Sequence, residues 1–219
     1  MLQPADWLSI WITLKLAFVS TALLLLIGLP LAWWLARTKS RVRPVAEAIV
    51  ALPLILPPSV LGFYLLVVLG PHGPVSGARL AFTFTGLVIG SIVYSLPFVV
   101  QPLRDAFIAV SDDLLDAAKT LGASRTDRLL YVALPLARQG LLTATVLGFA
   151  HTVGEFGVAL MIGGAIPGQT RVASIAIYQH VEAGDYSHAH WVAGTLLAFS
   201  FTMLLIVHVV NRKTLVVHA

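Results

Sequence analysis

Cysteine is absent from this 219-residue chain, and charged residues make up only 11% of it. The lack of cysteine excludes disulfide bonds and metal sites built from thiolates. The scarcity of charge, together with 58% hydrophobic residues and a mean hydropathy of +0.90, excludes an ordinary soluble domain, in which apolar residues make up about 45–50%. The sequence therefore indicates an all-α polytopic membrane protein, because a helix satisfies its own backbone hydrogen bonds in lipid.

The chain has little room for a soluble catalytic domain. A helix needs about 20 apolar residues to cross a bilayer, and five segments reach that length: 8–35, 45–69, 82–103, 136–162 and 191–210. We therefore expect a single membrane domain over residues 1–219 with about five transmembrane helices. No basic residue precedes the first apolar run and no small-residue cleavage site follows it, so we do not expect a cleaved signal peptide.

Basic residues are distributed unevenly among the connections between these segments. Only Arg79 and Arg171 lie in the second and fourth connections, and Lys15 lies inside the first segment. The other eleven of the 14 basic residues are on the opposite side: Arg37, Lys39, Arg41, Arg43, Arg104, Lys119, Arg125, Arg128, Arg138, Arg212 and Lys213. The positive-inside rule then places the N-terminus outside and the C-terminus in the cytoplasm. It also explains the net charge of +4 without nucleic acid as a partner.

A charge-dense loop, residues 105–128, lies between the third and fourth segments on the predicted cytoplasmic side. Lys119 suits the C-terminal end of a helix, and Gly122 suits the left-handed residue that follows one. Side-chain oxygens and negative charge, which suit a helix N-terminus, come from Ser111, Asp112 and Asp113. These signals predict a helix over Asp112–Leu121. Ser124 and Asp127 resemble the cap of a second helix running toward Pro135.

The first of these helices is amphipathic. An apolar stripe is formed by Leu114, Leu115, Ala118 and Leu121, and Ala117 is small enough for a partner backbone to approach. Such a helix lies either in a groove of another protein or on lipid. Because four acidic residues disfavour an anionic lipid surface, we expect a protein groove; they are Asp112, Asp113, Asp116 and Asp127.

Two places inside the apolar segments carry residues that disturb a helix. Pro57 and Pro58 remove backbone donors and bend or break the second segment, and their role is either to shape packing or to line a pore. Glu155, flanked by Gly154 and Gly157, is the only acidic residue well inside an apolar stretch. Intramembrane carboxylates are costly and usually paired or functional. We expect a structural or gating role for Glu155 and no direct contact with substrate.

The cytoplasmic loop resembles a known signature. Asp116, Ala117 and Ala118, followed by Gly122 and then by Leu134 and Pro135, resemble the "EAA" motif of type I ABC importer permeases, with Asp in place of the usual Glu. In that family the loop is a coupling helix that docks into the ATP-binding subunit. The resemblance implies that these six residues couple the chain to an ATPase, that ATP is used by that partner, and that this chain binds no cofactor or metal. It also implies that a bulky residue at 122, or Asp116→Lys, abolishes uptake.

Further stretches narrow the resemblance. Four stretches look like those of molybdate permeases, whose relatives carry sulfate or thiosulfate: residues 52–62 (LPLILPPSVLG), 154–157 (GEFG), 166–171 (IPGQTR) and 175–178 (IAIY). The resemblance does not distinguish molybdate from tungstate as the substrate. This implies alternating access in a homodimer in a bacterial or archaeal cytoplasmic (inner) membrane. Its partners would be two ATP-binding subunits, an external oxyanion-binding protein and membrane lipid. Arg171 either helps to receive the oxyanion or the binding protein, or is an ordinary loop cation.

Parts of the sequence are also consistent with three other classes of protein. A metal site could be built from His180, Glu182, Asp185, His188 and His190, although their spacing matches no standard site. An intramembrane protease would need an activated serine beside a histidine, and the candidates are Ser91, Ser95 and His151. An ion-coupled secondary transporter would also use broken helices, but it has no need of a docking helix for a soluble partner.

Overall fold

The structure is a computed structural model that describes residues 2–74, 77 and 79–216, with only the backbone for residues 206–216. Every regular element in these ranges is a helix, which confirms the all-α class. The side chains of Arg212 and Lys213, two of the eleven basic residues on the predicted cytoplasmic side, lie outside the described residues.

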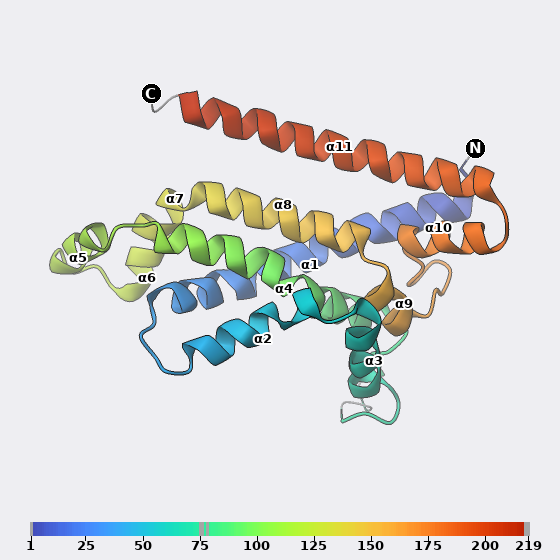
Figure 1. Cartoon of the computed structure of the whole chain (residues 1–219), viewed down its shortest axis with the longest axis horizontal. Coiled ribbons are helices and arrows are strands. Elements are labelled where there is room, and N and C mark those ends of the chain that lie inside the picture. The colour runs from blue at the N-terminus through green and yellow to red at the C-terminus, as the bar shows by residue number, and fades with distance from the viewer. Residues whose placement is uncertain (1, 75–76, 78, 217–219) are drawn as a thin grey trace.

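Three helices form the centre of the molecule: α1 (Pro4–Arg37), α4 (Phe84–Ile108) and α8 (Arg138–Gly154). They pack against one another along most of their length, as Figure 1 shows. The shared core is apolar and almost inaccessible to solvent, with Leu24, Leu35, Val99, Leu103 and Phe107 at its centre. Small residues let the helices approach closely, since a Cβ on Gly28 would lie 3.0 Å from Val99 Cγ1.

Helices α4 and α8 pack closely at Gly140. A Cβ added there would lie 2.2 Å from the Cβ of Ala106 and 3.2 Å from the carbonyl oxygen of Pro102. Gly140→Ala is therefore expected to push the two helices apart, and overpacking of this kind costs about 1–3 kcal/mol. The measurement is the midpoint of thermal unfolding in detergent. Gly194→Ala in α11 (Tyr186–Val216) is the control, because no atom lies within 4 Å of its added Cβ; equal midpoints would contradict this packing.

The second apolar segment is broken into α2 (Arg43–Ile55) and α3 (Pro58–Leu69), whose axes differ by 113°. Pro57 and Pro58 stand at the break, as expected for residues that cannot continue the hydrogen-bond ladder. The new direction of α3 is fixed by its packing on α9 (Gly157–Gly163). Added Cβ atoms on Gly62 and Gly157 would lie 2.8 Å from Met161 and Pro58, so both glycines are needed for this contact.

The number of membrane spans follows from these lengths. Helices α1, α4 and α11 are each long and apolar enough to cross a membrane, and the count rises to five if each of two bent pairs forms one span. One pair is α2 with α3, and the other joins residues 125–136 to α8 at 81°. Helix α10 (Ala173–Glu182) lies near the N-terminus of α1, at the end of the molecule opposite the loop between α4 and α8 (Figure 1).

That loop contains four short elements. They are α5 (Asp112–Thr120), α6 (Arg125–Asp127), the π-helical turn η2 (Arg128–Ala133) and α7 (Leu134–Leu136). The second helix expected from the sequence is thus present, but it is widened by the π-helical turn before Pro135. In Figure 1 this group and the C-terminal end of α11 lie at the same end of the molecule.

Candidate coupling site and membrane cavity

Helix α5 is closed at both ends by its own sequence. Ser111 accepts a hydrogen bond from the backbone N–H of Asp113 at 3.2 Å, as the sequence predicts. At the other end Gly122 adopts a φ of +88°. The N–H of Gly122 bonds to the carbonyl of Lys119, and that of Ala123 to the carbonyl of Ala118, both at 3.0 Å. This pair of bonds is a Schellman motif, which needs a left-handed residue and so favours glycine.

The following turn is held by a reciprocal cap. Ser124 Oγ accepts from the N–H of Asp127 at 3.1 Å, and Asp127 Oδ2 accepts from the N–H of Ser124 at 3.0 Å. These hydrogen bonds hold the pKa of Asp127 below its ordinary value. The two caps leave only Leu121, Gly122 and Ala123 as a hinge between α5 and α6.

The apolar stripe expected on α5 is divided between two environments, which corrects the prediction of one partner-facing surface. Leu115 is 5% exposed and packs into the core formed by α1, α4 and α8. Leu114 and Leu121 are 50% and 87% exposed. Neighbouring positions on a helix are about 100° apart, so Leu115 can anchor α5 to its own chain while Leu114 stays free for a partner.

Arg37, at the last position of α1, ties α5 to two membrane helices. Its guanidinium donates to the carbonyl oxygens of Phe107 at 2.6 Å and Val110 at 2.7 Å, at the C-terminal end of α4. It also forms an ion pair with Asp112, the first residue of α5, and lies over the ring of Trp33. The sequence marks Arg37 only as a topological charge, because nothing local distinguishes it from the other basic residues of the same connection.

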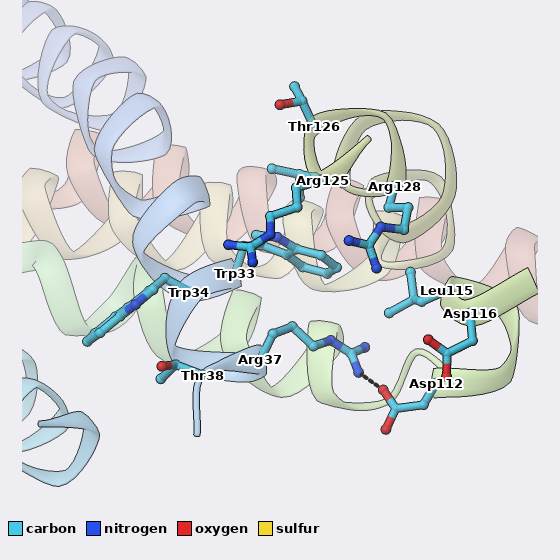
Figure 2. A pocket seen from close by; sticks show the side chains of 11 residues that line it. Trp33, Trp34, Arg37, Thr38, Asp112, Leu115, Asp116, Arg125, Thr126 and Arg128 are labelled. Carbon is cyan, nitrogen blue, oxygen red and sulfur yellow. Dashed lines mark hydrogen bonds and ion pairs between the residues drawn. The ribbon is translucent and has the colours of Figure 1, made fainter. Parts of the chain in front are cut away.

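A cavity of about 590 Å³ opens between this end of α1 and the loop elements. Figure 2 shows Arg37 reaching Asp112 on one side, with Arg125 and Arg128 opposite. Asp116 also lines this cavity. The other predicted coupling residues do not line it: Ala117, Gly122 and Pro135 are exposed, whereas Ala118 and Leu134 are half-buried.

A second cavity, of about 510 Å³, brings together the two disturbed places in the apolar segments. Its lining includes Pro58 from the start of α3 and Gly154, Glu155 and Gly157 from the junction of α8 and α9. Pro57 immediately precedes this lining as the N-cap of α3. Residues from distant parts of the sequence therefore meet, and we call this space the junction cavity.

Glu155 is 4% exposed and connects the α8–α9 junction to two other helices. Its Oε2 accepts a hydrogen bond from Ser91 Oγ of α4 at 2.6 Å, and its backbone carbonyl accepts from Ser174 Oγ of α10 at 2.6 Å. Its Oε1 has no hydrogen-bond partner among the described residues. Glu155 therefore lies at a helix break and contacts two other helices, and its structural or gating role stays a prediction.

At the opposite end, Arg171 is held inside the chain. Its Nε donates to Gln179 Oε1 at 2.7 Å, and its Nη1 lies 4.0 Å from Oδ1 of the buried Asp6. Only 12% of the side chain is exposed. The side chain is therefore positioned by contacts within the chain.

His180 and His188 share the carboxylate of Asp185, since His180 Nδ1 lies 3.9 Å from Asp185 Oδ2, but each has a nearer contact. His180 Nε2 contacts Asp6 at 2.8 Å, and His188 Nδ1 contacts Asp185 at 2.6 Å. The backbone N–H and ring of His188 hold the pKa of Asp185 below its ordinary value. Across the described part of the chain, no group of three or more such side chains could hold a metal ion.

Ser95 and His151 do form a pair, with 2.9 Å between Ser95 Oγ and His151 Nδ1. Ser95 has no accessible surface, however, and it also contacts Thr152 at 3.2 Å. A nucleophile must reach its substrate, so this geometry does not support a protease.

These features define a membrane transport subunit, with broken helices around an open cavity and a capped helix presented at one end. The sequence comparison is decisive on the class: residues 28–216 match the family described as binding-protein-dependent transport system inner membrane component, and the chain belongs to this family. It is an ABC-type permease in the inner membrane, working with an ATPase subunit and a periplasmic binding protein. ATP hydrolysis belongs to the ATPase.

Several relatives are similar over nearly the whole chain. The molybdenum transport system permease protein of Azotobacter vinelandii is 55% identical over 210 residues, which cover 93% of both proteins. The corresponding Escherichia coli K12 protein is 33% identical over 94% of this chain and 93% of its own length. A probable sulfate transport system permease of Anthoceros angustus is 36% identical over 91% of this chain and 71% of its own.

Solved structures share the fold. A chain of the methionine ABC transporter, in an inward-facing crystal form, has a TM-score of 0.76 at 22% identity and covers 97% of this chain and 99% of its own. A chain of a bacterial alginate ABC importer has a TM-score of 0.80 at 18% identity, over 96% of this chain and 80% of its own. The type I importer architecture predicted from the sequence is confirmed at the level of the fold.

Proposed function

We propose that this chain is the permease of an ATP-driven oxyanion importer whose substrate is molybdate. The observation that carries the proposal is the 55% identity to a molybdenum transport permease over 93% of both chains. A probable sulfate permease is 36% identical, which is below 55% but above the 33% of the Escherichia coli molybdenum permease, so sulfate is tested as a competitor as well. Tungstate is a tetrahedral oxyanion like molybdate and is the first competitor to test.

Two copies of this chain would form the pathway, each docked to one of two ATPase subunits. Helix α5, with Asp116, Ala117, Ala118 and Gly122 as predicted coupling residues, would fit a groove of the ATPase through its exposed Leu114 side. Leu134 and Pro135 would support α5 from the second turn. The support for this role is physical: α5 is rigidly capped, projects from the membrane helices and is tied to α1 and α4 by Arg37.

The gate of the pathway would lie at the junction cavity. Pro57, Pro58, Gly154, Glu155 and Gly157 all stand at helix breaks around it. Helix α8 connects this region to the second turn of the loop through α7. A movement of the loop can thus be transmitted along α8 to the helix breaks at the junction cavity. Arg171 stays a prediction as a contact for the binding protein.

The experiment is uptake into proteoliposomes that contain the permease, its ATPase and ATP, with the binding protein supplied outside. Radiolabelled molybdate is expected to accumulate only with ATP and the binding protein, and unlabelled tungstate and sulfate are added as competitors. Accumulation driven by a proton gradient without ATP would instead support the secondary-transporter alternative. Preference for sulfate over molybdate would overturn the assigned substrate but not the class.

A further inference from the structure

The junction cavity presents hydrogen-bond donors that the fold itself does not use. Tyr94 of α4, Ser59 of α3 and His151 of α8 all line it. The hydroxyls of Tyr94 and Ser59 have no hydrogen-bond partner among the described residues, and neither oxygen is among the buried unpaired atoms. Both hydroxyls are therefore available to something inside the cavity.

The start of α3 adds a backbone donor. The N–H groups of Val60 and Leu61 donate to the carbonyl of Pro57, and Pro58 has none to give. The N–H of Ser59 is left without an intrahelical acceptor at the positive end of the helix dipole. Because the Ser59 hydroxyl stands beside this N–H, the N-terminus of α3 and a side chain can act on one ligand.

The neighbours of His151 orient its ring. Phe98 stacks on it with 3.8 Å between ring centroids, and Tyr94 lies 4.6 Å away. Thr152 gives its own hydroxyl proton to the carbonyl of Gly148 at 3.0 Å. Ser95 Oγ lies 2.9 Å from His151 Nδ1, and we assign Ser95 as the donor because the imidazole nitrogen is a stronger acceptor than the Thr152 hydroxyl oxygen at 3.2 Å. With this assignment the proton of the neutral imidazole is on Nε2, which makes His151 a third donor.

Glu155 is the only acidic residue in the lining, and it sets the charge of the cavity wall. No Lys, Arg or His of the described residues lies within ion-pair distance of it, and one oxygen accepts only from Ser91. An ionised carboxylate without a cation is costly at membrane depth. The neutral carboxyl is favoured here, so the wall carries donors without a fixed negative charge to repel an anion.

The size of the cavity suits a small hydrated anion. A water molecule occupies about 30 Å³ in the liquid, and the cavity measures about 510 Å³. A tetrahedral oxyanion thus fits together with part of its hydration shell. Three side-chain donors and one backbone N–H would take the place of some of the water molecules around the anion. A tightly closed cage with more donors would hold the anion too long for transport.

We propose that the junction cavity is a transit site for a tetrahedral oxyanion, held by the hydroxyls of Tyr94 and Ser59 and by the Nε2–H of His151. The inference rests on the proposed function for its substrate class and adds a binding site within the permease. No proton is transferred, because each donor keeps its own hydrogen. The site is transient and becomes accessible from either side during the transport cycle.

The test uses the full transporter in proteoliposomes and compares Tyr94→Phe with Tyr64→Phe. Tyr64 belongs to α3 and is 62% exposed, and it does not line the cavity, so it controls for loss of a tyrosine hydroxyl. A lost hydrogen bond to a charged ligand corresponds to about a tenfold effect or more. Tyr94→Phe is expected to lower molybdate uptake about tenfold while the ATPase rate stimulated by the loaded binding protein is kept. Uptake per ATP hydrolysed falls accordingly.

Two outcomes would overturn the transit site. One is uptake by Tyr94→Phe equal to that of Tyr64→Phe; the other is a parallel fall of uptake and ATPase rate, which indicates damage to the conformational cycle. Ser59→Ala gives a second variant, expected to lower uptake per ATP in the same manner, so a poorly folding Tyr94→Phe does not end the test. Wild-type transporter that fails to take up molybdate would contradict the proposed function itself, whatever the variants do.

Discussion

Replacing Gly122 by valine is expected to lower ATP-driven uptake at least about fivefold and to weaken retention of the ATPase during purification. The Schellman motif requires a φ of +88° at this position. A left-handed conformation costs a non-glycine residue about 1–2 kcal/mol, and a β-branched residue is especially unfavourable there. A cost of 1–2 kcal/mol changes a population by a factor of roughly 5–30. Valine would therefore raise by this factor the population of molecules in which α5 is reoriented relative to α6.

Gly122→Asn provides the matched control. Asparagine tolerates the left-handed region, and an added Cβ at position 122 meets no atom within 4 Å. Gly122→Asn should retain most of the uptake, and both variants should keep the thermal stability of the membrane helices. If valine and asparagine reduce uptake equally, bulk at the partner interface and not backbone conformation is responsible. Full uptake with valine would contradict a coupling role for this turn.

Replacing Arg37 by glutamine is expected to uncouple ATP hydrolysis from uptake. The two bonds to the carbonyls of Phe107 and Val110 are charge-assisted, and bonds of this kind contribute about 1.5–3 kcal/mol each. The ion pair with Asp112 adds little, because the Asp112 side chain is 83% exposed. Without the guanidinium, the segment that leads from the end of α4 into α5 loses its hydrogen bonds to α1. The measurement is molybdate taken up per ATP hydrolysed, with a decrease of about tenfold or more expected.

Two further variants separate the contributions of Arg37. Arg41→Gln removes an exposed basic residue from the connection between α1 and α2 and controls for charge at the membrane surface. Asp112→Asn removes only the ion pair and should have a small effect. If Arg37→Gln and Arg41→Gln show the same uptake per ATP, the link through the α4 carbonyls carries no coupling.

The local features of the loop were predictable from the sequence because the interactions that create them span only a few residues. The predicted helix Asp112–Leu121 is found as Asp112–Thr120, with the cap at Ser111 and the left-handed residue at Gly122. The Ser124 and Asp127 cap was predicted for the same reason. Helix caps and glycine turns depend on neighbours a few positions away, which the sequence displays directly.

Features that depend on distant contacts were not predictable. Arg37 meets carbonyls 70 and 73 positions away, and Glu155 meets a hydroxyl 64 positions away. Leu114 and Leu115 are equivalent in hydropathy, and only the packing of α5 on the membrane helices decides that Leu115 is buried. The helix break at Pro57 and Pro58 was predictable from chemistry, but the 113° turn follows from how α3 packs on α9.

The π-helical turn also lay beyond the sequence signals. Residues 128–133 contain no glycine or proline, and their composition suits an ordinary helix. The wider turn precedes Pro135, which cannot donate a backbone hydrogen bond. Turns of this kind occur mostly as single widened turns inside α-helices. The composition of such a segment does not distinguish the two helix types.

The loop from Ser111 to Asp127 satisfies its helix ends internally, with one cap before α5, a glycine motif after it and a reciprocal cap at α6. The local conformation of this segment depends on the rest of the protein only through the burial of Leu115 and the ion pair between Arg37 and Asp112. The segment can therefore be exchanged between related proteins as a unit. With the coupling role proposed for α5, we expect chimeric permeases that exchange this loop together with Arg37 to recruit a different ATPase while the membrane pathway stays intact.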